Sequence, residues 1–481
     1  MPIEIPQLNI PALGPILIII GTGLLVLIFD LMVKDKRSLG WLSLVGVLVA
    51  AGLGLAQQAS AGFDPAFQAV FRTDSYAHFF NLIFLVTAAL SILVAMGYLG
   101  RIGLQKGEYF ALLLFATSGM MVMAAATDLM IVFLGLEIMS IALYIMSALN
   151  RDERASGEAG LKYFMLGAYT SAFFLYGAAL TYGATGSTNF NDMAAALTAG
   201  GVRDPIALLG LGLLLIGFAF KVAAVPFHWW TPDVYCGAPT AVTTFMSVGA
   251  KAAGFAALVR MLMVSFSPGF VVDWQLALAA LAVLTMTLGN VTALAQKDVK
   301  RMLAYSSIAH AGYIFVGVAA GTAEGVSSAL FYLMVYAFMN IGAFAVIGAL
   351  ERKNEVGTNL KEYAGLAARN PWLALGMAIF LLSLTGFPPL AGFWGKLYLF
   401  RAAVQADLTW LAVIGMLNSG VAAFYYLTVV VEMYFKRAAE DAPTFSLNAP
   451  TRLALGLAAI ATVIIGLWPA LLIDLASVSF F

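Results

Sequence analysis

Apolar runs long enough to cross a membrane follow one another along almost the whole of this 481-residue chain. A membrane-spanning helix needs about 20 mostly apolar residues, and fourteen segments of the sequence meet that requirement. We place them at 12–33, 40–57, 76–99, 108–126, 128–149, 157–182, 205–227, 239–265, 274–295, 300–320, 326–350, 371–406, 409–435 and 452–473. The pattern predicts an all-α polytopic membrane protein.

Two of the predicted spans are interrupted. The seventh breaks at Pro226, and the twelfth breaks at the Gly-Phe-Pro-Pro run of residues 386–389. Proline removes a backbone donor and clashes with the preceding helical turn. Backbone freed in this way is tolerated at membrane depth only where protein or water satisfies it. We therefore expect protein or water to satisfy the backbone at both breaks.

The spacing of the breaks predicts an internal repeat. Pro226 lies 118 residues after the start of the fourth span, and Pro388 lies 114 residues after the start of the ninth. Each block holds five helices, so the second enters the membrane from the opposite side, and paired broken helices in inverted halves mark an ion or substrate pathway. We expect three N-terminal helices in 1–107, a five-helix repeat in 108–266, its inverted partner in 267–436, and a C-terminal helix in 437–481.

Composition removes several classes of function. The chain is 62% hydrophobic and 10% charged with zero net charge, which is unlike a soluble domain and gives no support to a nucleic-acid partner. Cys236 is the only cysteine, so an internal disulfide and a cysteine-ligated cluster are excluded. The sequence has no nucleotide-binding glycine motif and no clustered metal ligands. We expect no cofactor, no metal and no redox centre in this chain.

The basic residues of the loops predict the orientation. Seventeen lysines and arginines, Lys300 among them, fall in loops on one side. Only Arg72, Arg203, Arg260 and Arg401 are assigned to the other side. The positive-inside rule makes the first side cytoplasmic, and an even number of crossings then places both termini outside. The N-terminus lacks the basic region of a signal peptide, so we expect a retained first helix. The strong charge bias of the loops and the full set of spans favour a bacterial inner (plasma) membrane location.

Four ionisable residues inside the spans are the main candidates for function, because each costs roughly 3 kcal/mol at mid-membrane on insertion scales. Glu137 lies near the middle of the fifth span, Lys221 just before the first break, Lys251 deep in the eighth span, and Lys396 just after the second break. Burial disfavours a charged side chain, and an opposite charge nearby favours it. A Glu137–Lys221 pair that closes and opens could therefore pass a proton to Lys251 and on toward Lys396.

Three further residues are candidate proton relays, each with a structural alternative. Lys162 is only five residues into the sixth span and could equally reach the cytoplasmic surface. His310 lies among small hydroxyl residues, where it is a relay or a hydrogen-bonded core histidine. His228 lies in the first break and could simply pair with freed backbone. The four main candidates have structural alternatives too, such as a neutral core glutamate or a lysine that reaches the membrane surface.

These residues lie in segments that resemble the antiporter-like subunits of NADH:quinone oxidoreductase (respiratory complex I). The matching segments are the one around Glu137, VPFHWWTPDVYCGAPT after Lys221, SVGAKAAGF around Lys251, KDVKRMLAYSSIAHAGY (297–313) and TGFPPLAGFWGKLYLF (385–400). Lysine at 396 resembles the subunit N branch of the family, whereas the subunit M pattern has glutamate there. The resemblance implies fourteen helices with two inverted five-helix repeats and a proton channel through Glu137, Lys221, Lys251 and Lys396.

The resemblance also implies partners. It places subunit M on one flank and the small subunit K on the other, within the lipid bilayer, and assigns the redox chemistry to other subunits. The sequence contains no site for an energy input, so that input must come from partners. A cation/proton antiporter subunit of a related multisubunit exchanger is the alternative function. A structural spacer and a quinone-binding subunit are further readings.

Overall fold

Helices make up nearly all of this computed structural model, which describes residues 9–59, 70–199, 204–352, 357–438 and 447–477. Within these ranges, twelve helices are long and apolar enough to span a membrane, and two shorter apolar helices accompany them. The two shorter helices are α8 (Pro205–Lys221) and α15 (Pro371–Thr385), which belong to the interrupted spans. The predicted all-α polytopic fold with two broken helices is therefore confirmed.

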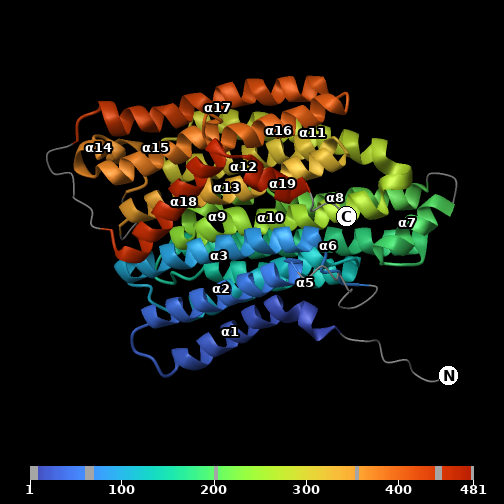
Figure 1. The fold of residues 1–481 in the computed structure, drawn as a ribbon, viewed down its shortest axis with the longest axis horizontal. Helices are drawn as coiled ribbons and strands as arrows, with labels where there is room; N and C mark the ends of the chain where they lie inside the picture. The colour runs from blue at the N-terminus through green and yellow to red at the C-terminus, as the bar shows by residue number, and fades with distance from the viewer. Residues whose placement is uncertain (1–8, 60–69, 200–203, 353–356, 439–446, 478–481) are drawn as a thin grey trace.

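The helices lie roughly side by side in a single bundle (Figure 1). The long helices are α1 (Gly14–Asp30), α2 (Arg37–Ala59), α3 (Ser75–Ile102), α4 (Glu108–Ala125), α5 (Leu129–Ser147), α6 (Arg154–Thr185), α10 (Thr240–Ser265), α11 (Ser267–Leu294), α12 (Val299–Ala319), α13 (Ala323–Leu350), α17 (Thr409–Phe435) and α18 (Ala449–Leu467). Shorter elements join or extend them: η1 (Ile10–Leu13), α7 (Phe190–Ala199), α9 (Trp230–Gly237), η3 (Leu360–Tyr363), α14 (Leu366–Arg369), α16 (Ala391–Gln405) and α19 (Ala470–Ser477). The broken spans continue as α9 and α16.

The two predicted blocks contain the same backbone feature at matching places. Asp128 caps α5 and forms an isolated antiparallel bridge with Asn189, and Asp298 caps α12 and forms such a bridge with Asn359. Each bridge joins residues 61 apart (189 − 128 and 359 − 298). The backbone hydrogen bonds that flank the two bridges are all between 2.8 and 3.0 Å long. The helices that follow the bridges, α7 and α14, lie at opposite ends of the bundle in Figure 1, as inverted blocks require.

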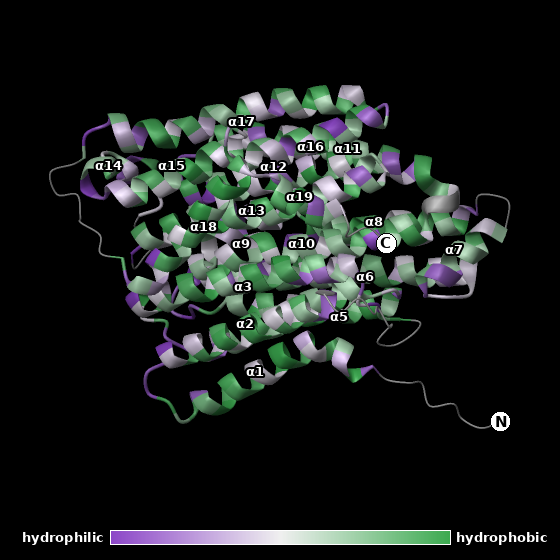
Figure 2. Cartoon of the chain, viewed as in Figure 1, coloured by the Kyte–Doolittle hydropathy of each residue, from purple (hydrophilic) through white to green (hydrophobic). Residues whose placement is uncertain are grey.

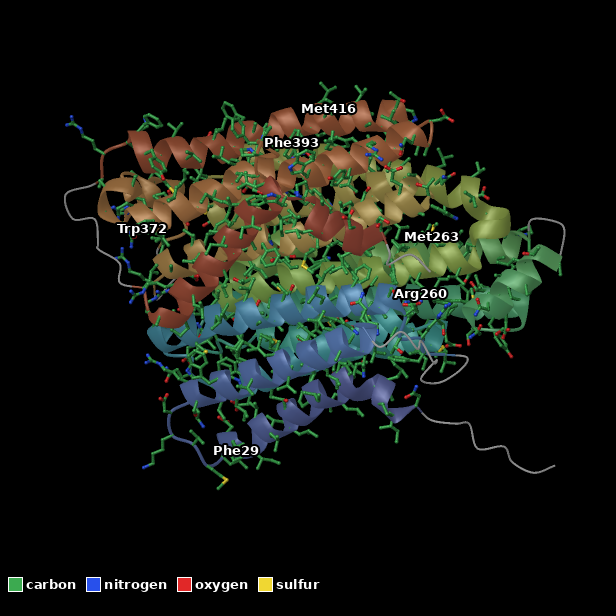
Figure 3. The ribbon with its side chains drawn as sticks, viewed as in Figure 1. Phe29, Arg260, Met263, Trp372, Phe393 and Met416 are labelled. Atoms are coloured by element: carbon green, nitrogen blue, oxygen red, sulfur yellow. The ribbon has the colours of Figure 1, made fainter. Side chains whose placement is uncertain are left out.

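The centre of the bundle is formed by three helices that lipid does not reach. The apolar window of α10 is completely buried, and those of α12 and α13 are 94% buried, whereas those of α1, α17 and α18 are about one-third buried. Hydrophobic residues cover the peripheral helices, and hydrophilic ones gather at helix ends (Figure 2). Arg260 lies inside the bundle, while Phe29, Trp372 and Met416 lie at its margin (Figure 3). Polar groups on α10, α12 and α13 are therefore shielded from the hydrocarbon.

Two basic residues that were assigned to loops are buried instead. Arg260 lies within α10 and is 1% exposed, with both terminal nitrogens 2.7 Å from the carboxylate of Asp74. Lys300 is the second residue of α12 and is 2% exposed, with its Nζ 3.7 Å from Glu351. Counting charges by sequence position could not reveal the acidic partners, which are 186 and 51 residues away (260 − 74 and 351 − 300). Buried partners, rather than solvent, stabilise both charges.

One other prediction about a span needs correction. The last predicted span does not run unbroken through 452–473, because α18 ends at Leu467 and α19 begins after Pro469. Gly466 lies against the second break, where a Cβ would clash with the carbonyl oxygen of Pro389. The end of α18 thus packs against one side of the interruption between α15 and α16, where Phe387 remains 56% exposed.

Candidate functional site

The residues just before Pro226 are buried and neighbouring helices satisfy their backbone, whereas Pro226 and Trp229 are exposed. The chain leaves α8 after Lys221, and the N–H of Val225 donates to the hydroxyl of Thr285 on α11 at 3.0 Å. The indole N–H of Trp230 donates to the carbonyl of Phe220, near the end of α8, at 3.1 Å. Protein groups therefore satisfy the backbone on the α8 side of this interruption, as a polar pathway requires.

Lys221 is 3% exposed, at the end of α8 beside that break. Its Nζ donates to the hydroxyl of Ser140 on α5 at 2.6 Å. The rings of Tyr144, Tyr163 and Phe220 have their centroids 5.6 to 5.8 Å from the same nitrogen. Aromatic faces at this distance attract a cation. The site can hold the ammonium form without a carboxylate in direct contact.

Glu137 belongs to the same site but does not form the predicted pair with Lys221. It lies one turn before Ser140 on α5 and is half-buried, and it accepts a hydrogen bond from Ser171 of α6 at 2.5 Å. Among the described residues no ion pair joins Glu137 to Lys221, and Ser140 occupies the position next to the lysine. The carboxylate therefore lies near the lateral surface formed by α5 and α6.

Lys251 lies in the completely buried helix α10, where it is 2% exposed. Its Nζ donates to both the carbonyl and the hydroxyl of Ser307 on α12, the latter at 2.6 Å, and lies 5.4 Å from the ring centre of Tyr336. Gly254, one turn later, brings α10 close to the first break, because a Cβ there would lie 3.5 Å from Cβ of Lys221. The two lysines therefore extend from directly packed helices.

His310 lies at the middle of a tyrosine cluster on α12 and is 1% exposed. Its Nδ1 is 2.6 Å from the hydroxyl of Tyr332, and its Nε2 is 3.1 Å from the hydroxyl of Tyr426. The same Tyr426 hydroxyl bonds Ser306, next to the Ser307 that holds Lys251. A neutral imidazole has one donor and one acceptor nitrogen, so the Tyr–His–Tyr chain can take up a proton on one side and release one on the other.

Lys396 lies after the second break and is 5% exposed. Its Nζ donates at 2.9 Å to the carbonyl of Thr385, which the end of α15 leaves free of a helical partner. The nitrogen is also 4.6 Å from the ring centre of Tyr313, whose ring lies 5.6 Å from that of His310. Lys221, Lys251, His310 and Lys396 thus form a row of buried polar groups that runs from one break to the other.

The remaining two candidates lie off this row. Lys162 is 41% exposed and forms ion pairs with Glu158 at 2.7 Å and Asp233 at 2.9 Å. His228 is half-buried in the turn after Pro226, and its carbonyl accepts the N–H of Thr231 at 2.9 Å. No ion pair or hydrogen bond links either side chain to the three buried lysines within the described part of the chain. The geometry favours the structural alternative for both.

The sequence did not single out the hydroxyl and aromatic residues that hold the charges. These are Ser140, Tyr144, Tyr163, Ser306, Ser307, Tyr313, Tyr332, Tyr336 and Tyr426. One signal was available on α12, where Ser306, His310 and Tyr313 recur at spacings of four and three and so share a helix face. The other contacts join different helices, and hydropathy alone does not predict them.

Comparison with known proteins identifies the family of this chain. A family model described as NADH:quinone oxidoreductase/Mrp antiporter, transmembrane, matches residues 126–422. The chain belongs to this family. The matched range includes Glu137, Lys221, Lys251, His310 and Lys396, and both broken helices.

Individual members of the family match over nearly the whole chain. The NADH-quinone oxidoreductase subunit N of Trichlorobacter lovleyi is 49% identical, over 99% of this chain and 99% of its own. A chain of respiratory complex I from Thermus thermophilus with bound aureothin superimposes with a TM-score of 0.81 at 34% identity, covering 96% of this chain and 99% of that one. A chain of the Mrp complex from Dietzia has a TM-score of 0.86 at 20% identity, over 98% and 97% of the two chains, which shows a shared fold.

Proposed function

We propose that this chain is the proton-translocating subunit N of an NADH:quinone oxidoreductase, and that it moves protons through its buried polar row. The observation that carries the proposal is the row itself, in which three lysines and a histidine, each at most 5% exposed, connect two broken helices. The names of the family members, at up to 49% identity among those compared, support the same assignment.

The contacts support a stepwise proton transfer along the row. Opening and closing of the Glu137–Lys221 site changes how strongly the ammonium of Lys221 is held, because a carboxylate favours the charged form and burial disfavours it. Lys221 passes its proton to Lys251, which Ser307 holds, and the adjacent Ser306 bonds the Tyr426 hydroxyl that contacts His310. His310 faces Lys396 across the ring of Tyr313. Moving one charge against 100 mV takes about 2.3 kcal/mol, which redox chemistry in partner subunits supplies.

The lateral position of Glu137 supports a protein neighbour on the α5–α6 face. Around Glu137 this face exposes apolar side chains, including Ile138 at 44%, Ile141 at 52% and Tyr169 at 65%. A carboxylate facing lipid would be costly, so a subunit covers it. Subunits M and K are the proposed neighbours on the two flanks. The loop charges support a bacterial inner membrane location with both termini on the periplasmic side.

A cation/proton antiporter subunit is the second candidate function, and the fold shared with the Mrp complex chain is the observation that favours it. The test uses the assembled complex reconstituted in liposomes with NADH and a quinone. We expect NADH-driven proton transport that sodium does not change, and reduced transport in Glu137→Ala and Lys221→Ala variants whose subunits still copurify. Full transport in both variants would defeat the proposal. Sodium-dependent pH changes without NADH would instead support the antiporter.

A further inference from the structure

A solvent-accessible cavity of about 180 Å³ lies at the end of the bundle where the predicted cytoplasmic loops gather. It opens between the loop after α5, the end of α3 and the end of α13, and Asn150, Asp152 and Arg352 are among its lining residues. Its other lining residues include Tyr98, Lys300 and Glu351, which are themselves buried. Charged groups of the protein interior therefore line this cavity.

Glu351 connects the cavity to the central helix. It is 4% exposed, it lies 3.7 Å from Nζ of Lys300, and its carboxylate accepts a hydrogen bond from the hydroxyl of Thr240. Thr240 is the first residue of α10, and its N–H donates to the hydroxyl of Tyr98 at 3.1 Å. Glu351 therefore belongs both to the lining of the cavity and to the hydrogen-bonded start of α10.

From Thr240 inward, one face of α10 carries an unbroken series of polar side chains. Thr240, Thr244, Ser247 and Lys251 follow at spacings of four, three and four residues. At 3.6 residues per turn these positions fall within an arc of about 60° and cover about 16 Å along the axis. The series thus ends at Lys251. All four residues are buried in a helix that lipid does not reach.

The hydrogen bonds of this face leave oxygen lone pairs available. The hydroxyl of Thr244 donates to the carbonyl of Thr240 at 2.7 Å, and that of Ser247 donates to the carbonyl of Thr244 at 3.1 Å. Ser247 also accepts from the amide of Asn340 at 2.7 Å. A hydroxyl that donates to the backbone retains lone pairs for an incoming water or proton. The face therefore presents a line of hydrogen-bond acceptors between the carboxylate of Glu351, which lines the cavity, and the buried amine of Lys251.

We propose that Glu351 and the Thr240–Thr244–Ser247 face of α10 form the route by which cytoplasmic protons reach Lys251. A proton from water in the cavity neutralises the carboxylate of Glu351, then passes through water held along the hydroxyls, and finally binds the neutral amine of Lys251. Nothing is oxidised or reduced, and one proton leaves the cytoplasmic side for each that Lys251 gains. This route rests on the proposed function, since it delivers protons to the row that the proposed function uses.

The test measures NADH-driven proton uptake from the cytoplasmic face, in inside-out vesicles containing the intact complex. Thr244→Val removes the hydroxyl without changing the shape. We expect uptake to be about tenfold slower. One net hydrogen bond is worth up to about 1.4 kcal/mol, and a barrier raised by that amount slows a rate about tenfold. Thr244→Ser restores the hydroxyl and should restore the rate. Glu351→Gln should slow uptake at least as much, because it removes the exchanging group.

The neighbouring Thr243 supplies a matched control, because its hydroxyl donates to the carbonyl of Tyr235, away from the face, at 2.8 Å. Thr243→Val should leave uptake unchanged. Equal slowing by Thr243→Val and Thr244→Val would overturn the route, as would unchanged uptake in both Glu351→Gln and Thr244→Val. Lys251→Ala separates the two proposals. If Lys251→Ala retains full uptake, the proposed function is wrong. If Lys251→Ala stops uptake while Glu351→Gln and Thr244→Val leave it unchanged, only the route is wrong.

Discussion

The buried ion pair between Arg260 and Asp74 makes a quantitative prediction about stability. The two side chains are 1% and 9% exposed, and they share two hydrogen bonds of 2.7 Å, while Nε of Arg260 also donates to the carbonyl of Ala124. Arg260→Met would leave the Asp74 carboxylate with the N–H of Ala77 and with Arg72, 3.6 Å away. Removing one partner of a buried pair typically costs about 3–5 kcal/mol.

The cost should come from the orphaned charge rather than from lost packing, because methionine can fill the space of the arginine stem. The double variant Asp74→Asn with Arg260→Met has no buried charge and keeps a good helix cap at position 74. We expect it to recover most of the lost stability. Arg72→Gln is the matched control, since Arg72 is 54% exposed and its pair should contribute about 0–1 kcal/mol.

The pH dependence of the same variants follows from the position of Asp74 just before α3. Burial, the largest influence, raises the pKa of Asp74, and the Arg260 guanidinium brings it below its ordinary value of 3.8. In the native protein, the stability that the ionised Asp74 contributes is therefore fully present above pH 3.8, and it is lost only as the pH falls further. Without Arg260, burial dominates and the pKa rises. Arg260→Met should then gain stability as the pH falls from 7 toward about 5.

Thermal unfolding of the detergent-solubilised complex, followed by resistance of this subunit to protease, measures both effects. We expect Arg260→Met to unfold at a clearly lower temperature than the native protein and the double variant to lie between them, close to the native one. Two results would refute the reasoning. One is a double variant as unstable as Arg260→Met, and the other is an Arg260→Met variant whose stability does not change with pH.

Three further predictions concern the row and its supports. Ser140→Ala removes the hydroxyl that accepts from Lys221 at 2.6 Å, and it should slow proton transport without loss of assembly, while Ser140→Thr retains transport; equal transport rates in the two variants would contradict this. Gly386→Ala forces an alanine into φ +91° with its Cβ 3.0 Å from the Lys396 side chain, so it should cost about 1–3 kcal/mol in thermal unfolding and reduce transport; a native-like melting temperature would count against it. Trp394→Phe loses the indole hydrogen bond to the carbonyl of Gly466 at 2.8 Å, so it should lower the stability of the protein by about 1 kcal/mol. The readout is proteolysis of α19, and unchanged proteolysis would argue against packing of α18 on the second break.

Hydropathy predicted the helices well because each span needs a long apolar run, and it located both breaks because proline and glycine interrupt such runs. Lys251 and Lys396 could be recognised as buried for the same reason, since apolar residues surround them in sequence. Arg260 and Lys300 lie near the ends of their predicted spans, where hydropathy does not distinguish a buried side chain from one that reaches the surface. Their partners, Asp74 and Glu351, lie far away in the chain, and only tertiary packing brings each pair together.

The contacts within the site were harder to predict than its members. Glu137 and Lys221 both lie in the site, yet Ser140 rather than Glu137 contacts the lysine, because the helical spacing turns the carboxylate toward α6. The sequence left two roles open for Lys162, a proton relay or a surface lysine, because it lies near a helix end, where a long side chain can reach the surface. The tyrosines around His310 come from α12, α13 and α17, and sequence carries no signal for such a meeting.

The most direct test of the proton pathway separates charge from titration at Lys251. Arginine keeps the positive charge but does not release its proton in proteins. The measurement is the number of protons transported per NADH oxidised by the reconstituted complex carrying Lys251→Arg, with subunit composition checked by copurification. The pathway predicts a clear fall in this ratio although the charge is retained. An unchanged ratio would contradict it, because Lys251 would then serve as a fixed charge and not as a carrier of protons.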